Sequence, residues 1–299
     1  FRVDLDCDIY ITGSNANLLD GELHTLLAGR FVEIPVYPLS FSEHLEFTRA
    51  FKEDKDKDRM AQFVDYLQFG GLPGIHEMNI DTEAVFPYLY DVFNSVMLKD
   101  VIVRRRIRDV ELLERVVRFI MDNMGNIFSA KTVSDFLKNQ GRRLSTETVY
   151  NYLDALEEAY LIRKVNRYDI KGKRQLETQE KFFLEDHGIK HAVLGYRGND
   201  IPGLLENVVF MELKRRAYTV HIGRLDKKEV DFIATRREEK LYIQVCYLLA
   251  NSETADREFG PLLEIRDQYP KLVLSLDPVW QYSREGVLRM NVIDFLLGE

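Results

Sequence analysis

Two small polar residues follow an apolar run near the start of the sequence. Residues 8–14 (DIYITGS) predict a buried strand that ends in a polar turn at Ser14, and Asn15 comes next. In open parallel sheets, ligands bind beyond the carboxyl ends of the strands, so these side chains can reach a nucleotide phosphate or its attacking water. Ser14 or Asn15 can equally well cap the helix that follows. The residues alone leave both interpretations open.

A second set of polar residues lies in the C-terminal part of the sequence. Glu206 falls in a predicted helix, Asp231 in a predicted strand and Gln244 in the next strand. In a restriction-type nuclease, a helix Glu, a strand Asp and an acid on the next strand hold Mg²⁺, and a Lys two residues later helps activate water. Here Gln244 replaces that acid and Cys246 replaces the Lys. The sequence therefore predicts a degenerate site that is retained for binding or assembly, with a divergent metal nuclease as a less favoured alternative.

The elements around Ser14 predict a parallel α/β sheet. A helix is expected over residues 18–28 and a second strand over 31–38, which completes a strand-helix-strand unit. Helical segments follow over the three ranges 40–51, 60–69 and 82–108, with Ser42 as a plausible N-cap of the first and an interruption in the last. Between the second and third of these, residues 70–74 (GGLPG) require a tight turn.

The middle of the chain has the pattern of a winged helix-turn-helix. Helices are predicted over 110–123, 129–140 and 146–159, with Ser129 capping the second and Ser145 or Thr146 the third, and a basic hairpin follows them. Four cations beside the third helix and on the wing can contact DNA phosphates: Arg142, Arg143, Lys171 and Lys173. Winged helices also serve as packing or dimerisation modules, so this alternative stays open.

Past residue 176 the pattern changes to a second α/β domain. Strands are expected over 181–184, 218–224, 229–235, 240–247 and 272–276, and helices over 203–216 and 256–268. The six histidines show no spacing typical of metal ligands, so no metal-binding residue is predicted.

Composition and charge narrow the function further. The chain carries a net charge of −8, yet the segment 104–174 has sixteen Lys or Arg against ten Asp or Glu, and the remainder is at −14. A basic region in an acidic protein is a candidate contact for a polyanion, although a solvated surface explains it equally well. Two distant cysteines fit a reducing cytoplasm, and no apolar run is long enough to span a membrane. Because the chain starts with Phe1 and enters a strand pattern at once, we expect it to be part of a longer protein.

Several long motifs resemble the prokaryotic AAA-type P-loop ATPases whose C-terminal domain has no assigned function. They extend through nearly the whole chain in the order of that family, as DIYITGSNANLL (8–19), LLAGRFVEIPVYPLSFSEHL (26–45), YLQFGGLPGI (66–75), NSVMLKDVIVRRRI (94–107), residues 128–173 and residues 204–234. The resemblance implies that Ser14 and Asn15 sense the γ-phosphate and that Arg30 is the arginine-finger candidate, able to stabilise transition-state charge. Arg30 can otherwise be a cation at a helix C-terminus. It also implies that Gly71 and Pro73 belong to a turn of the small lid domain near the nucleotide base, where an ordinary helix-helix turn is the alternative.

The sequence departs from a working ATPase in two respects. It holds no Gly-x-x-x-x-Gly-Lys-Ser/Thr phosphate loop, and no apolar strand ending in Asp-Glu precedes residue 8. The resemblance places both upstream of Phe1. We therefore expect ATP and Mg²⁺ to be cofactors of the full-length protein and expect no cofactor in this fragment.

The sequence thus predicts a mixed α/β protein of four parts. Residues 1–50 are the end of a parallel P-loop ATPase sheet, 51–108 a helical lid, 109–175 a winged helix-turn-helix and 176–299 a degenerate nuclease-like α/β domain. The expected function is an ATP-driven switch in the cytoplasm that couples hydrolysis to the C-terminal domains. A non-enzymatic DNA-binding or regulatory module is the alternative. Double-stranded DNA, an unidentified protein and a second copy of the chain are the partners that this organisation allows.

Overall fold

The computed structural model describes the 299-residue chain outside residues 1–7, 9, 14–31, 52–57, 78–81 and 279–281. Within this part, nine strands form one mixed sheet in the order β1-β3-β2-β4-β5-β6-β7-β9-β8. β2 pairs with β4, β6 with β7 and β7 with β9 in parallel, and the other neighbours are antiparallel. The strands are β1 (Ile127–Phe128), β2 (Ile162–Asp169), β3 (Arg174–Leu184), β4 (Thr219–Leu225), β5 (Lys228–Arg236), β6 (Glu239–Val245), β7 (Lys271–Ser275), β8 (Tyr282–Arg284) and β9 (Val287–Asn291).

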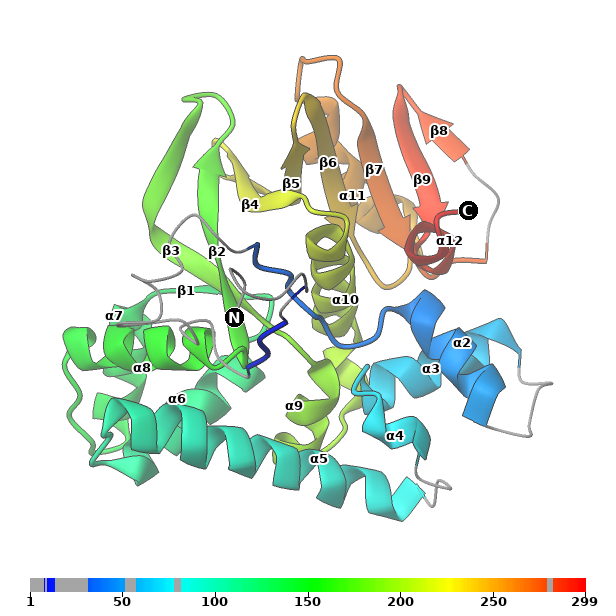
Figure 1. The fold of residues 1–299 in the computed structure, drawn as a ribbon. Coiled ribbons are helices and arrows are strands. Elements are labelled where there is room, and N and C mark those ends of the chain that lie inside the picture. Colours follow the sequence, from blue (N-terminus) through cyan, green and yellow to red (C-terminus); the bar gives the residue numbers. More distant parts are fainter. Residues whose placement is uncertain (1–7, 9, 14–31, 52–57, 78–81, 279–281) are drawn as a thin grey trace.

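All regular elements described before β1 are helices, and further helices pack against the sheet (Figure 1). The mixed α/β class predicted from the sequence is confirmed. The helices are α2 (Phe41–Phe51), α3 (Arg59–Phe69), α4 (Gly74–Glu77), α5 (Thr82–Val96), the π-helix η1 (Met97–Val103), α6 (Val110–Asp122), α7 (Ala130–Asn139), α8 (Thr146–Glu158), α9 (His187–Leu194), the short 3-10 helix η2 (Gly198–Asp200), α10 (Ile201–Arg215), α11 (Ser252–Leu263) and α12 (Val292–Leu297). None of the described helices combines the length and the apolar character needed to cross a membrane.

Local sequence signals fix the ends of the helices in the middle of the chain. Ser129 accepts the N–H of Thr132 and forms a capping box with it, and Ser145 accepts the N–H of Thr148. The predicted break in the segment 82–108 is also present, because α5 passes directly into the π-helix η1. Most helices bury their apolar faces in one large core cluster that extends from Phe41 to Leu296. The apolar face of α11 packs in a second cluster, and α4 packs with the first half of α5 in a third.

Three expectations for the N-terminal region are wrong. The predicted strand over 31–38 is absent from its described residues 32–38, and residues 10–13 of the predicted strand 8–14 are not in a strand either. Val32 and Val36 are 85% and 93% exposed. A strand is stable only when it pairs with a neighbour, and no described segment pairs with these residues. The predicted N-cap Ser42 is also wrong: α2 starts one residue after Ser40, and Ser40 makes the capping bonds.

The sheet is continuous between the predicted winged helix and the C-terminal part. β2 and β3 form the predicted basic hairpin, and residues 167–169 of β2 also pair in parallel with residues 222–224 of β4. The predicted boundary at 175/176 lies at the start of β3. Backbone hydrogen bonds therefore link the strands of the predicted winged helix to those of the C-terminal part.

Candidate functional site

The three residues predicted to act on the γ-phosphate are Ser14, Asn15 and Arg30. All three lie outside the described residues. Their proposed roles therefore rest on the sequence, and the described site begins at residue 37, where the chain runs toward α2.

A glycine turn between α3 and α4 holds the residues predicted to lie near a nucleotide base. The backbone N–H of Gly71 donates to Oδ2 of Asp186 at 2.7 Å, and its carbonyl accepts the N–H of Leu39 at 2.7 Å. A Cβ atom on Gly71 would lie 2.4 Å from the carbonyl oxygen of Leu39, so no larger residue fits without a shift. Pro73 accepts the N–H of His76 at the start of α4. In this structure the backbone groups of Gly71 are thus used by the protein itself.

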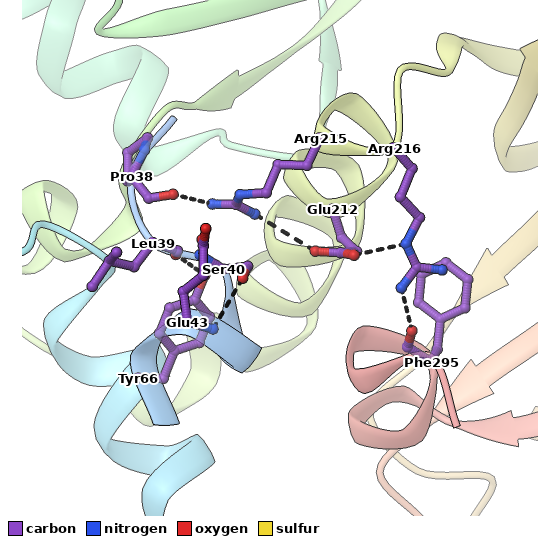
Figure 2. Close-up of polar contacts among 9 residues, drawn as sticks. All are labelled: Pro38, Leu39, Ser40, Glu43, Tyr66, Glu212, Arg215, Arg216 and Phe295. Atoms are coloured by element: carbon purple, nitrogen blue, oxygen red, sulfur yellow. Dashed lines mark hydrogen bonds and ion pairs between the residues drawn. The ribbon is translucent and has the colours of Figure 1, made fainter. Parts of the chain in front are cut away.

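Residues 38–40 are held from several elements by bonds to their main chain (Figure 2). Arg215 at the end of α10 donates to the carbonyl of Pro38 at 2.5 Å, and the hydroxyl of Tyr66 on α3 donates to the carbonyl of Leu39 at 3.0 Å. Ser40 donates its N–H to Glu43 at 2.7 Å and accepts the N–H of Glu43 at 3.2 Å. We call residues 38–43 with the Gly71 turn, Tyr66, Arg215, Asp186 and His187 the junction.

The last turn of α10 links the junction to α12. Oε1 of Glu212 accepts from Arg216 at 2.7 Å, and Oε2 lies 3.8 Å from Arg215. Arg216 donates to the carbonyl of Phe295 at 2.6 Å and lies over its ring at 4.7 Å (Figure 2). Two consecutive arginines therefore point to different elements: Arg215 holds the segment before α2, and Arg216 holds α12.

The start of α9 closes the other side of the junction. Oδ1 of Asp186 accepts the N–H of Gly188 at 2.9 Å, and Nε2 of His187 lies 2.7 Å from the carbonyl of Tyr66. Burial raises the pKa of Asp186 to about 6, although the backbone N–H of Gly71 opposes this shift. Burial lowers the pKa of His187 to about 4. At neutral pH the imidazole of His187 is therefore uncharged, as its buried position requires.

The residues of the predicted nuclease-like site do come together, around a lysine that the sequence analysis did not select. Nζ of Lys181 on β3 lies 2.9 Å from Glu206, 2.7 Å from Glu229 and 3.7 Å from Asp231. Gln244 accepts the N–H of Asp231 at 3.3 Å, while Oδ2 of Asp231 accepts the N–H of Val245 at 2.8 Å. We call Lys181 and these three carboxylates the Lys181 cluster.

Burial and mutual charge decide the protonation of this cluster. Burial, and then the charge of Glu206, raise the pKa of Asp231. Burial also raises the pKa of Glu206, against the opposing effect of Lys181. For Lys181, burial lowers the pKa, but Glu206 and the other carboxylates outweigh it and the net shift is upward. The ammonium of Lys181 is therefore firmly charged.

Cys246 occupies the position at which a restriction-type nuclease would have a lysine. Burial raises the pKa of the Cys246 thiol to about 12, so at neutral pH it is a neutral buried group that does not replace a catalytic lysine. Within the described ranges, no group of three or more His, Cys, Asp or Glu side chains is arranged to hold a metal ion.

The four predicted DNA-contacting cations are spread around α8 and the hairpin. Arg142 pairs with Glu111 at 2.7 Å, and Lys171 pairs with Asp226. Arg143 lines a hollow of about 500 Å³ with Ser134, Lys138, Leu144 and Ser145, and Lys173 is exposed in the hairpin turn. The helix α8 itself has no Lys or Arg and carries four acids: Glu147, Asp154, Glu157 and Glu158.

Two family models match different parts of the chain, and the junction contains residues from both parts. Residues 2–45 match an AAA domain, and residues 60–200 match a domain of unknown function, DUF8612. The junction thus joins the end of the AAA match at α2 with the Gly71 turn and Asp186 of the second match.

Three relatives are uncharacterized proteins of microbes. One from Haemophilus influenzae is 38% identical over 296 residues, which cover 99% of this chain and 72% of the relative. Two from Methanocaldococcus jannaschii, MJ1544 and MJ1637, are 32% and 24% identical, and the chain covers 66% and 56% of their lengths. Given the first of these matches, the chain belongs to the family of the Haemophilus influenzae protein.

Proposed function

We propose that this chain is the downstream part of an AAA-type ATP-driven switch, and that the junction carries the nucleotide state from the ATPase to the C-terminal sheet. The observation that carries the proposal is the position of residues 38–43. They end the segment that matches an AAA domain, and Arg215, Tyr66 and Gly71 bond the main chain of residues 38 and 39.

The chemistry of the switch belongs to the whole protein. ATP and Mg²⁺ are its proposed cofactors, held by a phosphate loop and acids that this chain lacks. Ser14 and Asn15 are proposed to contact the γ-phosphate side, and Arg30 to stabilise charge in the transition state. A nucleotide-dependent shift of the segment that precedes residue 38 would move residues 38–40, and the three bonds to their main chain would pull on α10 and α3.

Arg215→Ala in the full-length protein tests this coupling. Hydrogen exchange of α10 is measured with and without a non-hydrolysable ATP analogue, together with the affinity for that analogue. We expect wild-type α10 to change its protection on binding, and Arg215→Ala to bind the analogue normally without this change. Arg216→Ala is the matched control, since it removes the adjacent guanidinium, which bonds α12 instead. An α10 that ignores nucleotide in the wild type, or responds equally in Arg215→Ala, contradicts the proposal.

A winged helix that contacts double-stranded DNA is the second candidate. The element order α6-β1-α7-α8-β2-β3, with β1 paired to β3, agrees with the order expected for a winged helix-turn-helix and supports this candidate. Because α8 is acidic, contact with phosphates would come from Arg143 near its start and from Lys173 on the hairpin. If so, duplex binding should weaken steeply with salt, and Lys173→Glu should reduce it for all sequences alike. Salt-insensitive or absent binding at low ionic strength favours a packing role.

A further inference from the structure

The Lys181 cluster puts one ammonium among three carboxylates from two elements. Glu206 comes from α10, Glu229 and Asp231 come from β5, and Lys181 reaches them from β3. The side chain of Lys181 is 3% exposed, and those of Glu206 and Asp231 are 16% and 8% exposed. A cation in this place favours the ionised form of these carboxylates, because buried carboxylates without a counter-ion repel one another and lose hydration.

The same arrangement leaves few free oxygen atoms for a second cation. Nζ contacts one oxygen each of Glu206 and Glu229, and the Asp231 oxygen that does not face it accepts the N–H of Val245. Gln244 already accepts the N–H of Asp231. A divalent ion such as Mg²⁺ or Mn²⁺ needs several of these oxygens at about 2.0–2.3 Å, so it would compete directly with the ammonium. Around the ammonium the described carboxylates are not arranged to hold a metal ion, so they would have to close in on one once the ammonium is removed.

We propose that Lys181 is a built-in cation that takes the place of a divalent metal ion, and that removing its ammonium converts this cluster into a binding site for Mn²⁺ or Mg²⁺. The cluster then serves as a metal-independent clasp. It holds the β2–β3 hairpin against α10 and β5, whatever the supply of divalent ions.

The nuclease pattern predicted from the sequence has Gln244 in place of its third metal-binding acid and Cys246 in place of its lysine, and a cluster closed by Lys181 needs neither of those two residues. Loss of charge at Gln244 lowers the affinity for a divalent ion but is tolerable when the central cation has a single charge. The ammonium comes from β3, which pairs with β2, and β2 pairs with β4 next to β5.

Lys181→Met in the full chain tests the proposal, with Mn²⁺ alone as the probe. Calorimetric titration and the electron paramagnetic resonance of free Mn²⁺ are expected to show one site in Lys181→Met, bound at least about tenfold more tightly than any site in the wild type. Adding Glu206→Gln should abolish the gain. Lys190→Met is the matched control: Lys190 is also buried, but it pairs with a single carboxylate, Asp200, at 2.9 Å, so its removal should create no site.

Folding is followed in parallel by circular dichroism and thermal unfolding. If Lys181→Met is unfolded alone, refolding by Mn²⁺ but not by equal ionic strength of NaCl supports the proposal, and Lys181→Gln repeats the test with a polar side chain. The proposal fails if folded variants bind Mn²⁺ no better than the wild type, or if neither variant folds even with Mn²⁺. It also fails if the wild type binds one Mn²⁺ that Glu206→Gln removes. Mn²⁺-dependent DNA cleavage by the wild type, lost in Lys181→Met, would instead make Lys181 a catalytic lysine.

Discussion

The junction and the Lys181 cluster are both buried and polar, but they are built in opposite ways. In the cluster, side-chain charges satisfy one another: one ammonium faces three carboxylates. In the junction, side chains such as Arg215, Tyr66 and Asp186 bond main-chain atoms of distant segments. The cluster is therefore held together by charge, whereas the junction is held together by hydrogen bonds that depend on the path of the backbone. A switch that moves the backbone would act through the junction and leave the ion pairs of the Lys181 cluster in place.

The largest loss of stability is expected when the ammonium of Lys181 is removed from the cluster. Lys181→Met should lower the free energy of unfolding at pH 7 by about 3–5 kcal/mol, because it leaves buried carboxylates without a cation. Lys190→Met should cost less, since a single carboxylate, Asp200, loses its partner there. Urea unfolding without divalent ions measures both. Equal losses in the two variants would mean that the number of carboxylates does not matter.

The acid sensitivity of the junction gives a smaller effect. Burial lowers the pKa of His187 to about 4 from 6.5, so between these values the unfolded chain takes up a proton that the folded chain refuses. This contribution destabilises the wild type as pH falls from about 6.5 to 4, by up to about 3 kcal/mol. His187→Gln keeps an N–H donor for Tyr66 without the titration, so it should lose less stability over that range.

Asp186 has the opposite effect on stability as pH falls, so its contribution must be distinguished from that of His187. Its pKa is raised to about 6, so protonation of Asp186 stabilises the folded state as pH falls below that value. Because Asp186 is present in both proteins, the difference between wild type and His187→Gln isolates the histidine. Parallel stability profiles of the two proteins from pH 6.5 to 4 would show that His187 is not held neutral.

The smallest effect tests the backbone path itself. Gly71→Ala should cost about 1–3 kcal/mol, because its Cβ would lie 2.4 Å from the carbonyl oxygen of Leu39. Gly198→Ala is the control, as a Cβ on Gly198 meets no atom within 4 Å. Thermal unfolding compares the two. If Gly71→Ala were as stable as Gly198→Ala, the backbone of the junction would move easily, and its path would not be what holds the junction together.

The sequence predicted best those elements whose signals are local. Ser129 and Ser145 are small polar residues directly before amphipathic segments, and both cap the helices expected there. The helix α9 was missed because it has only eight residues and contains Gly188. That glycine is needed for a long-range reason: a Cβ on it would lie 2.2 Å from the carbonyl oxygen of Phe69. Such a contact leaves no trace in the surrounding sequence.

The same limit applies to the candidate site. Glu206, Asp231 and Gln244 were selected by their order along the chain, and the structure brings them together. Lys181 was not selected, since it comes from the hairpin and lies 25 residues from Glu206 and farther from β5. A charged residue next to Phe182 and Phe183 in a strand was the one available signal of a buried ion pair. Asp186 and Arg215 bond backbone atoms, which carry no residue type, so sequence alone could not pair them with Gly71 and Pro38.

The continuous sheet has a consequence for how the chain is synthesised. Residues 167–169 of β2 pair with residues 222–224, which leave the ribosome more than fifty positions later. At ordinary rates of elongation this edge of β2 waits roughly 3 to 10 s for its partner. An open strand edge invites pairing with other nascent chains, and charged side chains discourage it. Arg167 and Asp169 lie on that edge, so the residues that give the hairpin its polar character also protect it during this interval.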